Sequence, residues 1–492
     1  MLAHVLHPSS VLHPTDSRPI SPALLAVILL CVAQTADMKI FDTPGSRERI
    51  IAGLYRLSLG LLQSEDPDRY FRTSEGWQYH PHSSGVTTNG SLSAADRQSS
   101  SKLLLPRQLG STQTILAVAI LTAVIAGGNY KADSLKWRDK LILLVRTSGL
   151  SIEDQDMDLE PAFCGFDNSD ATFRRRLIAK EERRRLFWFV YCLDRHLALS
   201  FNTGLNIAEG TFNVRAPLSE KLWQSLDTAD LHCIPTCPLG PPTTITGPGF
   251  FEYFLPLARV LGHIIDLHHI WNNPILGQYI PIDAIRCIER MLAQLEQELA
   301  DLESDGDTHF TTDRPLHPFF GQSNETTSRN GCPNGSPFEP PTAAASKDPE
   351  LQLVKIYSRY MLHVFHILLH GKWDPVSMIE DREDWITTDS YLNCVTHALS
   401  ASRILSQILT IDPELAFMPY LFGIYLLQGS FIFLLFLDPT PELGPDRLVE
   451  ELCETIIKAH EVSVVTLDTT FQVIQINAAF RTATWASLLG SA

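Results

Sequence analysis

Apolar residues recur at helical spacing along most of the chain, and clusters of Gly, Pro, Ser and Asn separate the apolar runs. The strongest run extends from Glu181 to Asn206, where apolar side chains share one helix face at Leu186, Val190, Leu193 and Leu197. The pattern predicts a helix that begins near Lys180 and ends after Ala198, because Gly204 and the short polar residues before it favour a turn. We expect the protein core to cover both sides of this helix.

The periodicity elsewhere predicts an all-α fold, an irregular multi-helical regulatory domain with long disordered loops. A helical hairpin is expected over 21–62, and further helices over 114–127, 132–148, 250–271, 283–302, 350–370, 388–410, 413–437 and 445–480. Gly371 is expected to stop a helix, and Asp412 with Pro413 to begin one as N-cap and first residue. No convincing strand pattern occurs, although residues 462–467 alone also fit a short strand.

Composition divides the chain into two helical halves. The stretch at 303–349 is rich in Pro, Gly, Ser and Thr and has too few aliphatic residues to offset the entropy of ordering. It is expected to be a disordered linker. The remaining parts are a loose leader at 1–20, an N-terminal helical half at 21–302 with a mobile loop at 63–113, and a C-terminal helical half at 350–492.

One apolar stretch has nearly the length of a membrane span. Residues 420–437 contain no charged side chain over 18 positions. However, Gln428 and Ser430 lie in its middle, and no Lys or Arg lies close enough to orient it. We expect a buried core helix and no membrane contact.

Charge and cysteine content limit the partners. The 492 residues carry a net charge of −17, which repels a polyanion and makes unaided nucleic-acid binding unfavourable. The nine cysteines are odd in number and widely spread, as is typical of reduced intracellular thiols.

A dense basic run precedes the strongest helix. Between Phe173 and Arg185, seven basic residues stand against two acidic ones. The run fits a nuclear-import address or a phosphate contact, and it equally fits a solvated helix end neutralised by the acidic residues before it.

Two groups of residues have spacings that metal sites use. His363, His366 and His370 share one helix face at i, i+3 and i+7, but their neighbours are strongly apolar, so packed or hydrogen-bonded histidines are expected. Cys233 and Cys237 lack the second pair that a structural zinc site needs. We therefore expect no metal in this chain.

Four separate blocks resemble one known family. Residues 181–206 are similar to the signature of the regulatory, or middle homology, domain of fungal zinc-cluster transcription factors. Residues 366–375, 417–431 and 459–467 resemble xylanolytic and cellulolytic activators of filamentous fungi in order and spacing. The similarity covers roughly Ser21 to Asp468, although Asn202-Thr203-Gly204-Leu205 replaces the family's Asn-Arg-Pro-Leu.

The resemblance implies a nuclear transcriptional regulator of plant-polysaccharide-degrading enzyme genes rather than an enzyme. It also implies partners among other transcription regulators and a sugar-type inducer. The family binds DNA through a six-cysteine zinc cluster, and no Cys-x2-Cys pair occurs here. Zinc is therefore expected only in a missing N-terminal cluster, and DNA contact only through a missing segment or a partner.

The residues expected to control activity follow from this resemblance. They are Arg184, Arg185, Asp194, Arg195 and Asn202 in the first block, with Trp373 and Asp374 in the second. No catalytic residue is expected. The alternative is an α-helical small-molecule-binding protein or enzyme with a pocket lined by His363 and His366.

Overall fold

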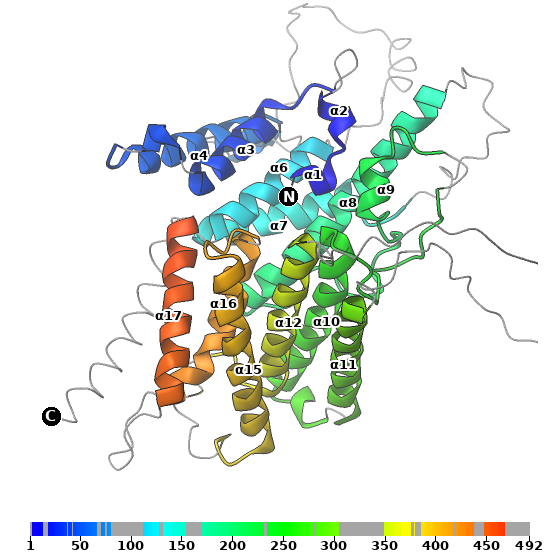
Figure 1. Ribbon diagram of the computed structural model, residues 1–492. Helices are drawn as coiled ribbons and strands as arrows, with labels where there is room; N and C mark the ends of the chain where they lie inside the picture. The colour runs from blue at the N-terminus through cyan, green and yellow to red at the C-terminus, as the bar shows by residue number, and fades with distance from the viewer. Residues whose placement is uncertain are drawn as a thin grey trace, which may run out of the picture.

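The computed structural model confirms the all-α fold (Figure 1). It describes residues 2–12, 18–36, 38–41, 43–65, 70–73, 76–79, 112–126, 131–153, 170–230, 234–279, 282–304, 349–374, 378, 385–417, 419–436 and 447–467. The main helices are α3 (Pro22–Thr35), α4 (Ser46–Glu65), α6 (Thr112–Ala126), α7 (Lys131–Thr147), α8 (Asp170–Phe201), α10 (Phe250–Trp271), α11 (Ile282–Ser304), α12 (Pro349–His370), α15 (Asp389–Ile411), α16 (Pro419–Ser430) and α17 (Arg447–Leu467). Short helices are α1 (Leu2–Val5), α2 (Pro8–Leu12), α9 (Glu220–Gln224), η1 (Lys39–Phe41), η5 (Leu276–Tyr279) and η7 (Phe431–Phe436).

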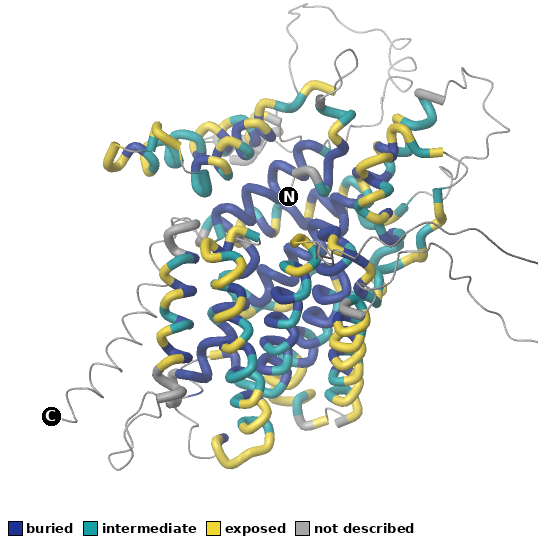
Figure 2. The backbone as a smooth tube through the Cα atoms, viewed as in Figure 1, coloured by how far each residue is buried: buried dark blue, intermediate teal, exposed yellow. Residues whose placement is uncertain are grey.

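The helices form two groups joined by α8. Helices α3, α4, α6 and α7 lie across one end of the molecule, and α10, α11, α12, α15, α16 and α17 run side by side below them (Figure 1). Helix α8 contacts α1, α6, α10 and α16, so it connects both groups. Almost every residue from 185 to 199 is buried, as Figure 2 shows for the centre of the molecule. The prediction that core covers both sides of this helix is confirmed.

Helix α8 is longer than its apolar pattern predicted. It begins at Asp170, ten residues before the predicted start, because the basic run has no helix breaker and continues the same helix. At the other end, Asn202 has φ of 49°. Its N–H donates to the Leu199 carbonyl at 3.3 Å, and the Thr203 N–H donates to the Ala198 carbonyl at 2.9 Å. These two bonds are a Schellman cap, in which Asn tolerates the left-handed conformation.

The predicted hairpin forms from α3 and α4, and a turn at residues 43–45 precedes α4. The Ser21 hydroxyl accepts a hydrogen bond from the Leu24 N–H at 3.1 Å, and Pro22 opens helix α3. Ala23, Leu24, Val27 and Leu30 are buried on the side of α3 that packs against α6 and α4. The capping residue and the apolar face therefore both favour the helix that forms.

The two predicted halves share one hydrophobic core. Helix α12 packs against α10 and α11 from the N-terminal half and against α15 and α16 from the C-terminal half. A single cluster of buried apolar side chains includes Leu193, Leu261, Phe365 and Tyr425. The predicted linker and the predicted mobile loop lie largely outside the described residues, so that division stays a prediction.

Four local predictions are corrected by the structure, and the prediction for Gly371 is confirmed. The leader is not loose where it is described, because Val5, Leu6 and His7 are buried against the rest of the protein. Within 63–113, strands β1 (Tyr70–Thr73) and β2 (Gly76–Tyr79) pair antiparallel. Residues 462–467 belong to helix α17, which continues the helical pattern of its preceding turns. Gly371 ends α12 as predicted, since its N–H donates to the Ile367 carbonyl at 2.7 Å.

Asp412 is the C-cap of α15, not the N-cap of the next helix. Its carboxylate accepts the N–H groups of Ala416 and Phe417, both at 3.0 Å, and so holds a loop before α16. The competition between local side-chain bonds and helix formation explains why the predicted helix starts later, at Pro419.

The apolar stretch at 420–437 is a core element where it is described. Phe422, Tyr425, Leu426 and Ile432 are buried. The Ser430 hydroxyl donates to the Leu427 carbonyl at 2.8 Å, so its polar group is satisfied within the protein. Within the part of the chain that the structure describes, no helix combines the length and apolar character needed to cross a membrane.

Candidate functional site along helix α8

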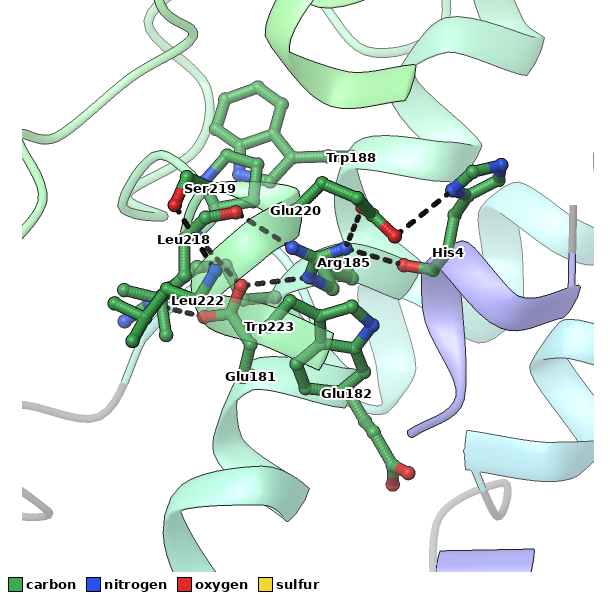
Figure 3. Close-up of polar contacts among 12 residues, drawn as sticks. His4, Glu181, Glu182, Arg185, Trp188, Leu218, Ser219, Glu220, Leu222 and Trp223 are labelled. Atoms are coloured by element: carbon green, nitrogen blue, oxygen red, sulfur yellow. Dashed lines mark hydrogen bonds and ion pairs between the residues drawn. The ribbon is translucent and has the colours of Figure 1, made fainter. Parts of the chain in front are cut away.

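Arg185 is the centre of a buried ion network (Figure 3). Its Nε donates to Glu181 Oε1 at 3.0 Å, and its Nη1 lies 3.1 Å from Glu220 Oε2. The same guanidinium donates to the Leu218 carbonyl at 2.7 Å and to the His4 carbonyl at 3.0 Å. Arg185 thus connects α8 to the segment before α9 and to the N-terminal helix α1.

The carboxylate of Glu220 is stabilised in its charged form. Burial alone would raise its pKa, but the hydrogen bond with His4 and the charge of Arg185 outweigh burial and lower the pKa to about 2. The Arg185 guanidinium also lies over the Trp223 ring, 4.4 Å from its centroid. A buried arginine with this many partners is typical of a structural network whose loss leaves charges uncompensated.

Arg184 forms a second pair on the neighbouring face of α8. Its Nη2 lies 2.5 Å from Glu153 Oε1, and its Nη1 lies 2.5 Å from Glu181 Oε2. Burial alone would raise the pKa of Glu153, but hydrogen bonds from Arg184 and from the Arg215 N–H lower it overall. Arg184 therefore ties the end of the segment after α7 to α8.

Asp194 holds the loop that follows α8. Its Oδ2 accepts the N–H groups of Asn206 and Ile207, both at 2.9 Å, and its Oδ1 accepts Arg138 Nη2 at 3.0 Å. Arg138 also donates to the Thr203 hydroxyl at 2.7 Å and to the Gly204 carbonyl at 3.0 Å. One charge pair, Arg138 with Asp194, therefore holds α7, α8 and the loop together.

Arg195 is fully buried between α8 and α10. Its guanidinium carbon lies 3.3 Å from the centroid of the Tyr191 ring, and its Nη2 donates to Glu209 Oε1 at 3.0 Å. Tyr191 also donates to Glu209. A Cβ on Gly262 of α10 would lie 3.2 Å from Arg195 Nε, so a larger residue there would require Arg195 to shift by a few tenths of an ångström.

We expect Gly262→Ala to destabilise the protein by about 1–3 kcal/mol, because the added methyl group pushes against the buried guanidinium of Arg195. Gly53→Ala is the matched control, since a Cβ on Gly53 meets nothing within 4 Å. Both thermal unfolding midpoints are measured by circular dichroism. Equal unfolding midpoints for the two variants would show that Arg195 moves to make room for the methyl group without a loss of stability.

The two predicted residues of the second block lie apart from this network. Trp373 is buried, donates to the Leu368 carbonyl at 2.8 Å and stacks on His268 with ring centroids 3.7 Å apart. Asp374 is exposed, and its carbonyl accepts the Met378 N–H at 3.1 Å. Trp373 therefore fastens the end of α12 to the end of α10.

The histidines of α12 face acids and another histidine at helix interfaces. His366 Nε2 lies 3.4 Å from Glu296, His370 Nε2 lies 3.3 Å from Glu289, and His363 Nδ1 lies 2.9 Å from His397 Nδ1. Across the described ranges, no group of three or more His, Cys, Asp or Glu side chains is arranged to hold a metal ion. The arrangement joins α11, α12 and α15.

Stability should fall on acidification. Burial lowers the pKa of His397 to about 3 and the pKa values of His196, His268 and His460 to about 4, against an ordinary value of 6.5. The unfolded chain therefore binds more protons than the folded chain between about pH 6.5 and 4. Each of the two fully buried histidines, His196 and His460, costs up to about 1.4 kcal/mol of unfolding free energy per pH unit in that window, and the partly exposed His268 and His397 cost less.

The thermal midpoint should thus be highest above pH 6.5 and fall steadily as the pH drops toward 4. Midpoints measured at half-unit steps at constant ionic strength check this. A midpoint that stays level from pH 7 to pH 5 would contradict neutral burial of these histidines.

The sequence patterns missed the partners of the predicted residues. Glu153, Glu220, Glu209 and Arg138 each hold a residue of α8, yet they lie 14–56 positions away from their partners. No repeating pattern in the sequence identifies these four residues as partners of α8. Gly262 had one usable signal, because a glycine inside a strongly apolar helix indicates a close approach by another group.

Comparison with known proteins identifies the family of this chain. Residues 3–285 match the profile of the fungal specific transcription factor domain, which spans α1 to the start of α11 and includes the whole network along α8. The match covers more than half of the chain. The chain belongs to this family. In this fungal specific transcription factor domain, the predicted block at 181–206 is the buried central helix and its cap.

Almost the whole chain is similar to longer proteins. It is 32% identical to the xylanolytic transcriptional activator xlnR of Aspergillus clavatus, 31% to that of Aspergillus niger and 32% to that of Neosartorya fischeri, each over 96% of this chain. The chain covers 50–52% of those proteins, so it spans about half their length. No solved structure matches it.

Proposed function

We propose that this chain is the regulatory region of a transcriptional activator that controls genes for plant-polysaccharide-degrading enzymes. The observation that carries the proposal is the 31–32% identity over 96% of the chain to proteins named xylanolytic transcriptional activators. The family match along α8 supports it. Because the relatives are activators, no catalytic role is part of the proposal.

The proposal places the protein in the nucleus and gives DNA contact to a zinc cluster outside these residues or to a partner. The charge of −17 supports this division, since it opposes approach to a polyanion. Several cations of the basic run are also engaged elsewhere. Arg184 and Arg185 bind carboxylates, and Arg174 donates to the Ala229 carbonyl at 2.6 Å.

Control in this proposal comes from a packing of helices with two stable arrangements, biased by a sugar-type inducer or by another transcription regulator. Arg184 and Arg185 join α8 to Glu153 and Leu218, which are distant in sequence, and Asp194 and Arg195 join it to the loop that follows the helix. Asn202 fixes the direction of the loop after α8, and Trp373 with Asp374 stands at the junction of α10 and α12. Changes at these joints would shift helices rather than single side chains.

The test is a reporter measurement in a filamentous fungus. The chain is fused to a DNA-binding domain of known target, and reporter expression is compared between growth on xylan and growth on glucose. We expect expression on xylan and repression on glucose. Fused protein that is folded and abundant but gives the same expression on both carbon sources would contradict a regulatory role.

Arg195→Lys tests the contact of α8 with Glu209 in the same assay. Lysine keeps the charge but cannot match the planar contacts of the guanidinium with Tyr191 and Glu209. We expect a folded fusion with an altered ratio between the two carbon sources. Arg183→Lys is the control, because Arg183 is exposed on the same helix and should leave the ratio unchanged.

A further inference from the structure

Three histidines meet where helix α15 packs against helix α12 (Figure 1). His363 of α12 and His397 of α15 place their Nδ1 atoms 2.9 Å apart. The His397 ring also stacks on the His366 ring of α12, with centroids 4.0 Å apart and planes 12° from parallel. The single histidine of α15 is therefore held by its edge and by its face against two histidines of the neighbouring helix.

The histidine contact lies at the edge of a closely packed helix interface. On α15, Cys394, Ala398 and Ala401 are buried and follow at i, i+4 and i+7, so they share one face. The Cys394 thiol donates to the Ile367 carbonyl of α12 at 3.6 Å. His397 follows Cys394 by three residues and is only partly buried. A change in the separation of the histidine rings therefore acts on the packing of the two helices.

The contact between His363 and His397 needs neutral rings. A ring nitrogen donates when it carries a proton and accepts when it does not, so a hydrogen bond at 2.9 Å requires one Nδ1 of each kind. When both rings are fully protonated, two N–H groups and two positive charges face each other across this distance. Protonation thus replaces an attraction between α12 and α15 with a repulsion.

Nearby acids are paired with other histidines. On α11, Glu296 Oε1 lies 3.4 Å from His366 Nε2, and Glu289 Oε1 lies 3.3 Å from His370 Nε2. The charged residues of α15 itself, Asp389 and Arg403, are exposed. Among the described residues, the groups whose charges act on the His363 and His397 rings come from α11 and α12, and none comes from α10, α16, η7 or α17; these groups are Glu296, Arg359, His366 and His370.

The surroundings favour the neutral form of both rings. Burial, with a smaller contribution from the neighbouring histidines, lowers the pKa of His363 and lowers that of His397 to about 3, against an ordinary value of 6.5. When α15 separates from α12, both rings return toward the ordinary value. Opening therefore binds protons below about pH 6.5, and closing releases them.

We propose that the contact of His363 with His397 is a pH-sensitive switch, which holds α15 against α12 while both rings are neutral and lets α15 separate when they are protonated. Each bound proton raises the equilibrium constant for opening by at most about tenfold per pH unit below pH 6.5, and partial exposure of the rings reduces this factor. This local opening is distinct from acid unfolding of the whole chain and does not depend on the proposed control of transcription.

Hydrogen–deuterium exchange of the full chain, followed by mass spectrometry, tests the switch. Exchange of α15 is compared at pH 7.5 and pH 5.5 after correction for the pH dependence of the chemical exchange rate. Helix α6 is the internal reference, because it contains no ionisable side chain and belongs to the other group of helices. We expect the opening constant of α15 to rise at least about fivefold more than that of α6 on acidification.

His363→Asn/His397→Asn removes both titrating groups but keeps hydrogen-bonding atoms near the two Nδ1 positions, because an amide offers a donor and an acceptor. We expect the excess response of α15 to disappear in this variant. His268→Asn is the matched control and should keep the response, since burial also lowers the pKa of His268 but its ring stacks on Trp373. Circular dichroism melts confirm that each variant is folded.

The comparison of α15 with α6 in the unchanged protein needs no variant. Equal rises in the opening constants of the two helices would overturn the proposal, because they would show opening of the whole molecule. An excess response of α15 that persists in the double variant, or that His268→Asn also abolishes, would likewise overturn it.

Discussion

Leu193→Asp should prevent folding of the whole domain. Leu193 is 2% exposed in the C-terminal half of α8, the helix that contacts both groups of helices. A carboxylate there is cut off from water and lies next to the buried Asp194. Its cost of several kcal/mol, added to the lost packing of a buried leucine, is comparable to the stability of an ordinary domain.

The expected observation is loss of the cooperative thermal transition and recovery of the protein in the insoluble fraction. Leu392→Asp is the matched control, because Leu392 is 62% exposed on α15 and the same substitution there costs little. A Leu193→Asp protein that melts cooperatively near the normal temperature would show that α8 is not the centre of the core.

Arg185→Met should destabilise the protein by about 3–5 kcal/mol, because it removes the cation from a buried pair and leaves its partners uncompensated. Glu181 is buried with one oxygen on Arg185, and the carbonyls of Leu218 and His4 lose their donor. The N-terminal helix α1 should also detach, since His4 is one of its contacts with α8.

Thermal midpoints measure the first effect, and limited proteolysis of the first twenty residues measures the second. Arg183→Met is the control, because Arg183 is exposed two residues earlier. Adding Glu181→Gln to Arg185→Met should recover part of the loss, which a double-mutant cycle quantifies. Identical thermal midpoints and cleavage rates for Arg183→Met and Arg185→Met would show that the Arg185 network does not hold α1 and the segment before α9 to α8.

Local physics made part of this fold predictable. The apolar repeat of α8, the helical pattern of α10 and the helix stop at Gly371 depend only on neighbours within a few residues, and the structure has them. The cap at Asn202 was recognisable as a turn for the same reason. The prediction that Asp412 begins a helix was wrong, because an aspartate side chain can either cap a helix or hold a loop. Here its carboxylate accepts the N–H groups of Ala416 and Phe417 and holds a loop.

The candidate site was predictable only in its α8 residues. The arginines were visible as a run, but whether each meets water or a buried carboxylate depends on segments that fold back from far away, such as Glu153, Leu218 and His4. The same limit applies to His366 and His370, whose acidic partners on α11 lie seventy and eighty-one residues earlier. Long-range contacts of this kind carry no periodicity in sequence.

Under the proposed function, this chain is the regulatory region of an activator of genes for plant-polysaccharide-degrading enzymes. The most direct measurement is transcript abundance of xylanase genes in a strain of the encoding fungus that lacks this gene, after transfer to xylan. We expect the transcripts to fall, to recover with the unchanged gene and with Leu392→Asp, and not to recover with Leu193→Asp. Xylanase transcripts that rise on xylan equally with and without the gene would contradict the account.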